Sequence, residues 1–325
     1  MFTPLQWAMR INFVITLLII LLLTACEKQK GQSSAIGTAQ VSMQRTGWLK
    51  SSELYEASGM QASFSREGDF FVHNDEGEPV IYAIDENGTD LGMVILVPAK
   101  NKDWEDITSV PVDNGRWMVA GDIGDNRAKR KYIKLYFFEE PSPGKNDRYA
   151  GRQDLQHTLV LTYPDGPRDC ESMAYDPVDK QILLLSKRDK PPRLYAVDIE
   201  TALTQMQAEL TFLGPTSKLR PPTLSDRARF GGRTDFISQP TGLDISSDGT
   251  RAAIITYRSL YLYHREPGED WISALQKKPT EVVGPPAVQN EAIAFSADGK
   301  AIFITTEKKP TPLYRFEWSD EPVRD

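Results

Sequence analysis

The chain has 325 residues, with 38 lysines and arginines against 45 aspartates and glutamates, so its formal net charge at pH 7 is −7. This acidic balance argues against a nucleic-acid-binding protein, which needs a concentration of basic residues on its surface. The length is sufficient for one large domain or two smaller ones.

The first 25 residues have the pattern of a secretory signal. Arg10 precedes the apolar run INFVITLLIILLL, and the small-residue stretch LTAC then ends at Cys26. The run is shorter than the ~20 apolar residues of a typical transmembrane helix, and the order basic, apolar, small is that of a signal peptide. LTAC resembles the lipobox of bacterial lipoproteins, which implies cleavage before Cys26 and attachment of lipid (palmitate) to its thiol. The alternatives are an uncleaved anchor and an ordinary signal.

The residues after Cys26 bear on location and domain structure. An aspartate at the next position resembles an inner-membrane retention signal of Gram-negative lipoproteins; Glu27 stands there instead, which favours the periplasmic side of the outer membrane. Residues 26–44 are polar and rich in Gly and Ser, which predicts a flexible tether to a single domain over residues 45–325. Lipidation of Cys26 leaves Cys170 without a disulfide partner, and we expect a buried, unreactive thiol there.

Five segments of the remaining chain share one frame of strand, tight turn, strand and third strand. The segments begin at Met60, Glu105, Glu171, Thr241 and Glu291. In the last two segments Asp-Gly lies between apolar runs, which is a strong hairpin signal. A further extended run precedes each segment, so each unit has four strands. Five such units predict an all-β protein with the β-propeller fold of five blades, with six blades as the alternative because residues 215–235 are long and irregular.

Few helices are expected between these strands. The best candidates are residues 268–278 (GEDWISALQKK) and residues 199–210 (IETALTQMQAEL). A tyrosine recurs in each third strand, which predicts packing between blades. These tyrosines are Tyr82, Tyr136, Tyr195, Tyr261 and Tyr314.

Equivalent residues of the units should lie on a ring around the propeller axis. One such column holds the first residue of each inner strand and the residue two before it, which share a face. The column contains Asp103 and Glu105, Asp169 and Glu171, Gln289 and Glu291, Gln239 and Thr241, and Ser58 and Met60.

A second column of oxygen-bearing side chains follows the turn in each unit. It consists of Asp75, Asp122, Ser186, Thr256 and Thr306. In the segment GDIGDN this register predicts that Asp122 faces the axis beside Glu105 and Glu171. Asp125 and Asn126 are then expected to shape the exit turn.

Carboxylates gathered in this way could bind a hard cation, because calcium takes six to eight oxygen ligands. The candidate ligands are Asp75, Glu105, Asp106, Asp122, Asp125, Asp169, Glu171 and Glu291. Ca²⁺ is the expected ion, since oxygen-rich sites favour Ca²⁺ or Mg²⁺ over zinc. The competing interpretation is that these residues cap strand ends or pair with Lys187, Arg188 and Arg258.

The segments DWEDI, GDIGDN, YPDGPRDCES, PTGLDIS and NEAIA resemble a family of secreted bacterial β-propeller proteins. That family is loosely similar to phytase-like and esterase-like propellers, and the resemblance covers nearly the whole chain after Met60. In phytase-like propellers, calcium ions at the channel mouth and neighbouring basic residues hold phosphate groups. The resemblance implies that Lys187, Arg188 and Arg258 face a ligand, and Glu307 follows the second column beside them.

Two functions follow from these expectations. The first is a propeller, held at the membrane by its lipid, that binds a periplasmic ligand or protein at its channel face. The second is a calcium-dependent phosphoesterase or related hydrolase, in which Glu105 or Glu171 serves as general base. No serine-nucleophile motif of the G-x-S-x-G type is present. His73 is the one histidine near the polar ring, and a structural role is expected for it.

Overall fold

The computed structural model describes residues 34–36, 39–231, 234–285 and 289–319 of the chain. The signal segment and Cys26 lie outside these residues. The described part is all-β, and none of its helices is both long and apolar enough to cross a bilayer.

Most strands belong to four-stranded antiparallel arrays, each ordered from an inner to an outer strand. The first array is β3 (Ala57–Ala62), β4 (Asp69–Asn74), β5 (Val80–Asp85) and β6 (Asp90–Val97). The second is β7 (Trp104–Val112), β8 (Gly115–Asp122), β9 (Ile133–Glu139) and β10 (Arg152–Thr162). The third is β11 (Cys170–Asp176), β12 (Gln181–Ser186), β13 (Arg193–Asp198) and β15 (Thr211–Pro215). The fourth is β16 (Pro240–Ile245), β17 (Arg251–Thr256), β18 (Ser259–His264) and β19 (Thr280–Val283).

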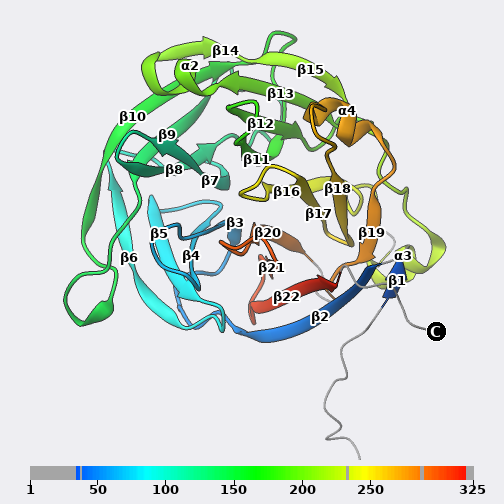
Figure 1. The fold of residues 1–325 in the computed structure, drawn as a ribbon, viewed down its shortest axis with the longest axis horizontal. Coiled ribbons are helices and arrows are strands. Elements are labelled where there is room, and N and C mark those ends of the chain that lie inside the picture. Colours follow the sequence, from blue (N-terminus) through cyan, green and yellow to red (C-terminus); the bar gives the residue numbers. More distant parts are fainter. Residues whose placement is uncertain (1–33, 37–38, 232–233, 286–288, 320–325) are drawn as a thin grey trace, which may run out of the picture. The chain divides into compact units, whose positions relative to one another are not determined.

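The last array closes with a strand from the beginning of the described chain. It comprises β20 (Asn290–Phe295), β21 (Ala301–Thr306), β22 (Pro312–Ser319), β2 (Ala39–Trp48) and the short β1 (Ser34–Ile36). Strand β2 pairs with β22 from Gln40 to Trp48 (blue beside red in Figure 1). Strand pairing therefore begins several residues before the expected end of the tether at residue 44. The sequence pattern missed this because polar and small residues fill an outermost strand.

The inner strands contact one another in the cyclic order β3, β7, β11, β16, β20 and back to β3 (Figure 1). Neighbouring inner strands run in the same direction: Met173 N donates to Asp106 Oδ2 (2.8 Å), and two residues further along Tyr175 N donates to Thr108 Oγ1 (3.1 Å). This arrangement makes the fold propeller-like. The outer strands β6 and β10 also pair in parallel, which joins the first two arrays at their rims.

Five apolar clusters, each between adjacent arrays, form the core. Leu183 of one array packs with Leu243 of the next, and Phe70 with Phe303. Each fully buried side chain of this size contributes roughly 1.5–3 kcal/mol through its removal from water. The repeated tyrosines are all buried, so the expectation of packing between blades is confirmed. Cys170 is also buried and free, and burial raises the pKa of its thiol to about 12.

Both expected helices are present as α2 (Ile199–Thr204) and α4 (Trp271–Gln276). A third helix, α3 (Leu224–Arg229), lies within the stretch that was expected to be irregular. Its start is fixed by a capping box, in which Thr223 and Asp226 satisfy each other's backbone N–H groups. The 3₁₀ turn η1 (Lys145–Asp147) occupies the loop before β10, and β14 (Gln207–Glu209) adds a short parallel pair to β10.

Candidate metal centre

Every inner strand carries a β-bulge at the same place, near its first residue. The register against the neighbouring strand slips by one residue there in all five arrays. The bulged residues are Ser58, Glu105, Glu171, Thr241 and Glu291, and all are buried. A bulged residue pairs with no partner strand, and its side chain is aimed differently from those of its neighbours. The repeated bulge therefore gathers one polar side chain from each inner strand.

The bulges correct the first column of the sequence analysis at one position. Ser58, not Met60, is equivalent to Glu105, and Met60 is packed in the apolar core. Ser58 Oγ donates to the backbone oxygen of Glu105 (3.0 Å) and lies 3.2 Å from its Oε2. The other four units align as expected.

The second column must be shifted by one residue in the first array only. Asp122, Ser186, Thr256 and Thr306 are the last residues of their strands, and their equivalent in the first array is Asn74 rather than Asp75. These side chains mostly fix turns: Ser186 Oγ accepts from Arg193 N (2.9 Å), and Asn74 Oδ1 accepts from Tyr55 N (3.0 Å). For these positions the strand-end interpretation is confirmed.

In four arrays the residue that follows the strand end is polar and contributes to the central site. These residues are Asp75, Lys187, Tyr257 and Glu307, whereas the equivalent Ile123 packs in the apolar core. Together with the bulged glutamates and Asp103, the charged ones form a group we call the central cluster: Asp75, Asp103, Glu105, Glu171, Lys187, Glu291 and Glu307.

Three carboxylates of the central cluster are close enough to share one cation. One oxygen each from Asp75, Asp103 and Glu105 lies within 4.8 Å of the other two. Asp75 Oδ1 is buried and has no hydrogen-bond partner among the described residues, which is costly for a carboxylate oxygen unless something else neutralises it.

Gly124 of the GDIGDN segment lies directly against this carboxylate triplet. A Cβ atom at this position would overlap Glu105 Oε1 and would stand 2.7 Å from Asp103 Oδ2. Only glycine leaves room for both carboxylates at this distance from the backbone.

The other half of the central cluster surrounds a single cation, Lys187. Its ammonium group forms a buried ion pair with Glu171 and lies 5.5 Å above the Tyr257 ring. Glu171 Oε2 remains buried without a hydrogen-bond partner. Gln239 Oε1 is buried and unpartnered as well, and it lines, with Lys187, a cavity of about 360 Å³ that is walled by Pro191, Pro192, Pro221 and Pro222.

The electrostatics of the cluster are dominated by burial and by repulsion between carboxylates. These effects raise the pKa of Asp75 to about 8 and hold the pKa values of Glu105 and Glu291 well above their usual range. Burial raises the pKa of Glu171 to about 7 against the opposing effect of Lys187, and that of Asp103 to about 6 against Arg130. Burial lowers the pKa of Lys187, but the facing glutamates outweigh this effect and raise it. One lysine does not compensate six carboxylates, so protons neutralise several of them near neutral pH.

Several predicted ligands are held elsewhere. Asp122 Oδ1 lies 2.7 Å from Arg130 Nη1, so this side chain forms an ion pair outside the carboxylate triplet. Asp122 is paired with Trp104 across the sheet, whereas Glu105 is the bulged residue that turns the other way. The expectation that Asp122 stands beside Glu105 and Glu171 is therefore wrong.

Asp125 and Asp169 organise the loop after β8. Asp125 Oδ2 accepts from Arg130 N (2.6 Å), and its own N–H donates to Asp169 Oδ1 (3.0 Å). Asp169 Oδ2 pairs with Arg188, which also reaches Asn126. Asp125 thus shapes the exit turn, as expected from GDIGDN.

Asp106 links the inner strands to one another and is not part of the central cluster. Its carboxylate accepts backbone N–H groups from Ile107 (2.9 Å), Met173 (2.8 Å) and Leu243 (3.3 Å), which belong to three different inner strands. Asp244 links two strands in the same manner, through Ile245 and Phe295.

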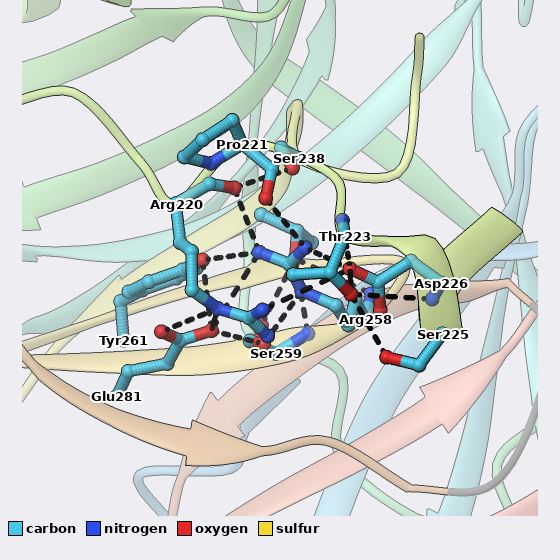
Figure 2. Close-up of polar contacts among 11 residues, drawn as sticks. Arg220, Pro221, Thr223, Ser225, Asp226, Ser238, Arg258, Ser259, Tyr261 and Glu281 are labelled. Carbon is cyan, nitrogen blue, oxygen red and sulfur yellow. Dashed lines mark hydrogen bonds and ion pairs between the residues drawn. The ribbon is translucent and has the colours of Figure 1, made fainter. Parts of the chain in front are cut away.

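Arg258 is buried in the polar network drawn in Figure 2, and its guanidinium N–H groups are all taken by residues outside the central cluster. Its Nη1 lies 2.8 Å from Asp226 Oδ2, and its Nη2 donates to Arg220 O (2.7 Å) and Tyr261 Oη (3.1 Å). Glu281 completes the network at 3.6 Å from Nη2. Arg258 therefore fastens the loop that carries α3 to the fourth array, and the sequence-based ligand role for it is wrong.

His73 is fully buried and packs edge-on against Trp104 at 5.5 Å. Its Nδ1 lies 3.1 Å from the backbone oxygen of Asn74, and burial lowers its pKa to about 4. A neutral ring in this position is structural, as the sequence analysis expected.

Two residues of this site, Asp103 and Gly124, are not among the ligands expected from the sequence. Their signal was the spacing itself: D-x-E at the inner strand and a glycine two residues after the second strand. No protein-family model matches this chain, and no curated protein matches it significantly.

Proposed function

We propose that the protein is a five-bladed β-propeller that binds a calcium ion at Asp75, Asp103 and Glu105. It presents this end of its channel to an extracytoplasmic ligand or protein. The observation that carries the proposal is the carboxylate triplet with its buried, unpartnered Asp75 oxygen. The cyclic contacts of the five inner strands support the number of blades.

The residues fit a hard divalent cation. The triplet offers three carboxylate oxygens, and Ca²⁺ takes carboxylate oxygens together with carbonyl and water oxygens in flexible geometry. A cation would also relieve the repulsion that raises the pKa of these carboxylates. Thiolate or imidazole groups do not contribute to the triplet, which disfavours zinc.

The cavity beside Lys187 supports ligand binding at the same end of the channel. Prolines supply its apolar wall, and Gln239 and Lys187 supply polar groups, which is the composition expected of a small-ligand pocket. A calcium-dependent phosphoesterase remains the alternative proposal. It has less support, because Lys187, Arg188 and Arg258, which would hold the phosphate, are each paired with a carboxylate.

Calcium binding is tested by calorimetric titration of metal-free protein and by its melting temperature with and without chelator. We expect binding of Ca²⁺ to raise the melting temperature, since an ion that binds only the folded state stabilises it. Asp103→Asn should weaken the affinity at least tenfold, while Asp113→Asn, an exposed turn carboxylate, should leave it unchanged. Equal affinities of the two variants would refute the site. Calcium-dependent turnover of phosphate esters by the same preparation would replace the binding function by the hydrolase.

We also propose anchoring of the protein through lipid on Cys26, at the periplasmic face of the outer membrane. The lipobox-like LTAC stretch supports this proposal. Cys26→Ser should abolish palmitate labelling and release the protein from the membrane fraction. Labelling that persists in this variant would contradict the anchor.

A further inference from the structure

A second polar pocket lies further along the inner strands, toward the hairpin turns. Its cavity is about 330 Å³ and is lined by residues of every inner strand, among them Gln61, Thr108, Tyr175, Asp244 and Phe295. Each follows the bulged residue of its strand by three or four positions, which corresponds to roughly 10–13 Å along an extended chain. Asp106 and Asp244 accept their backbone N–H hydrogen bonds between the central cluster and this pocket. Asp244 also lines the pocket.

The pocket contains a half-buried arginine without a counter-ion. Arg116 Nε and Nη2 both donate to Ser109, to Oγ (3.1 and 3.0 Å) and to the backbone oxygen (2.8 Å). These bonds use every N–H group on that side of the guanidinium and leave Nη1 with two N–H groups. Within the described part of the chain, Arg116 forms no ion pair. Withdrawing a cation from water without an opposite charge is unfavourable unless a ligand supplies one.

The carboxylates near Arg116 are committed to other partners. Glu140 accepts from Ser63 Oγ (2.6 Å), Ser65 N (2.9 Å) and Phe64 N (3.1 Å), and so fixes the turn after β3. Both oxygens of Asp244 accept backbone N–H groups. These two nearby carboxylates are therefore not available to pair with Nη1 of Arg116.

Two further features of the pocket indicate the shape of the ligand. The Arg116 guanidinium carbon lies over the Phe64 ring, 5.4 Å from its centroid, and the ring is still 66% exposed, so the stacked pair offers an exposed flat surface to a flat partner. Tyr175 is buried, lines the same cavity, and its hydroxyl makes no hydrogen bond to the described residues. A carboxylate could accept from both Arg116 Nη1 and this hydroxyl.

We propose that this pocket binds the carboxylate of a small ligand with a flat apolar body, with Arg116 and Tyr175 as donors and Phe64 as the stacking surface. Charge-assisted hydrogen bonds from a guanidinium are among the stronger polar contacts in proteins. The cavity volume lies at the lower end of the range for small-molecule sites, so the ligand is a single aromatic acid or the last residue of a peptide. This site is separate from the calcium site and does not depend on it.

The test is a calorimetric titration of the full-length protein in chelator with matched probe pairs. Benzoate and benzamide differ in charge at nearly equal shape, and N-acetylphenylalanine and its amide do so for a peptide end. We expect the acids to bind and the amides to bind at least tenfold more weakly. A preference for benzoate indicates a free organic acid as the natural source of the carboxylate, and a preference for N-acetylphenylalanine indicates a peptide C-terminus.

Two variants test the proposed ligand-binding residues, and a third serves as a control. Arg116→Gln should lose the preference for acids, and Phe64→Ala, which alters only an exposed ring, should weaken both acids severalfold. Arg152→Gln is the matched control, because Arg152 is an exposed arginine on the outer strand β10 without an ion pair among the described residues. If Arg116→Gln does not fold, Arg116→Lys retains the charge, and it should show weakened binding. Equal binding of acids and amides, no saturable binding, or an equal loss in Arg152→Gln would overturn the proposal.

Discussion

Gly124 is the residue on which the spacing of the three central carboxylates depends. A methyl group there meets Glu105 and Asp103 at distances that no Cβ atom adopts, so one of the carboxylates has to turn away. The glycine has an ordinary negative φ, and the constraint is therefore one of space and not of backbone strain.

We expect Gly124→Ala to fold but to bind Ca²⁺ at least tenfold more weakly, as measured by titration calorimetry. The control is Gly144→Ala, where the nearest atom to a new Cβ is 3.8 Å away. Unchanged affinity in Gly124→Ala would show that the triplet does not hold the ion.

The raised pKa values of the central carboxylates predict how stability depends on pH. Asp75 and Glu171 bind protons more tightly in the folded state, with pKa values of about 8 and 7, than in the unfolded chain, where carboxyl groups titrate near 4. The folded state therefore loses stability as pH rises from about 4 to 8, because the unfolded state holds fewer protons in this window. In chelator, the contribution of these groups should lower the melting temperature between pH 5 and pH 8.

Calcium should reverse this trend, because an ion competes with the protons for the same oxygens. The increase in melting temperature on adding Ca²⁺ should be larger at pH 8 than at pH 5. The variant Asp75→Asn removes one carboxyl group whose pKa is raised to about 8, and it should reduce the pH dependence of the melting temperature in chelator. A pH dependence that is the same in Asp75→Asn and in the unmodified protein would contradict this explanation.

At the scale of elements, the sequence predicted the strands and hairpins well but not their fine register. The turns at Asp248 and Asp298 and the apolar strands around them are local signals, and the structure has both hairpins. The bulges leave no such signal: Ser58 and Glu105 share neither size nor charge, yet they occupy equivalent positions. Columns obtained by counting residues were therefore displaced by two residues at Met60 and by one residue at Asp75. Glu105, Glu171 and Glu291 were found because their units contain the same D-x-E or Q-x-E spacing.

At the scale of elements, disruption of the network around Arg258 is expected to lower the stability of the domain most clearly. It joins the α3 loop to β18 and β19 through one buried cation and two carboxylates, Asp226 and Glu281. Arg258→Met should leave both carboxylates with only the more exposed Arg220 as a cationic partner, and should lower the free energy of unfolding by about 3 kcal/mol. Urea denaturation measures this loss, and Arg148→Gln, which breaks an exposed pair with Asp90, should cost about 1 kcal/mol or less. Similar losses in both variants would contradict a structural role for the network.

At the scale of the whole domain, the two ends of the described chain meet in one array. Strand β2 supplies the outer partner of β22, so the last array is complete only when residues from both ends are present. The ring of inner strands is then closed by pairing between segments that are far apart in sequence.

Removal of β2 should consequently destabilise the entire domain and not only its edge. A chain beginning at Gly47 exposes the long edge of β22, and we expect loss of a cooperative thermal transition together with aggregation. A chain beginning at Ser34 retains the strand and should unfold cooperatively. A cooperative transition at the same temperature in both chains would show that closure through β2 contributes little.

The repeated bulge also separates the side chains of the central site from the hydrogen-bonded ladders that stabilise the domain. Each bulged side chain stands outside the ladder of its strand, so its identity is almost free of the constraints that fix the neighbouring residues. Ser58 and Thr241 occupy two of the five places without contributing charge. A serine in place of Glu105 would remove one ligand oxygen without altering the ladder of the strand, whereas a carboxylate in place of Ser58 or Thr241 would lose the hydrogen bond that each hydroxyl donates to the neighbouring inner strand. The affinity and charge preference of such a ring can thus change through single substitutions, while the scaffold stays constant.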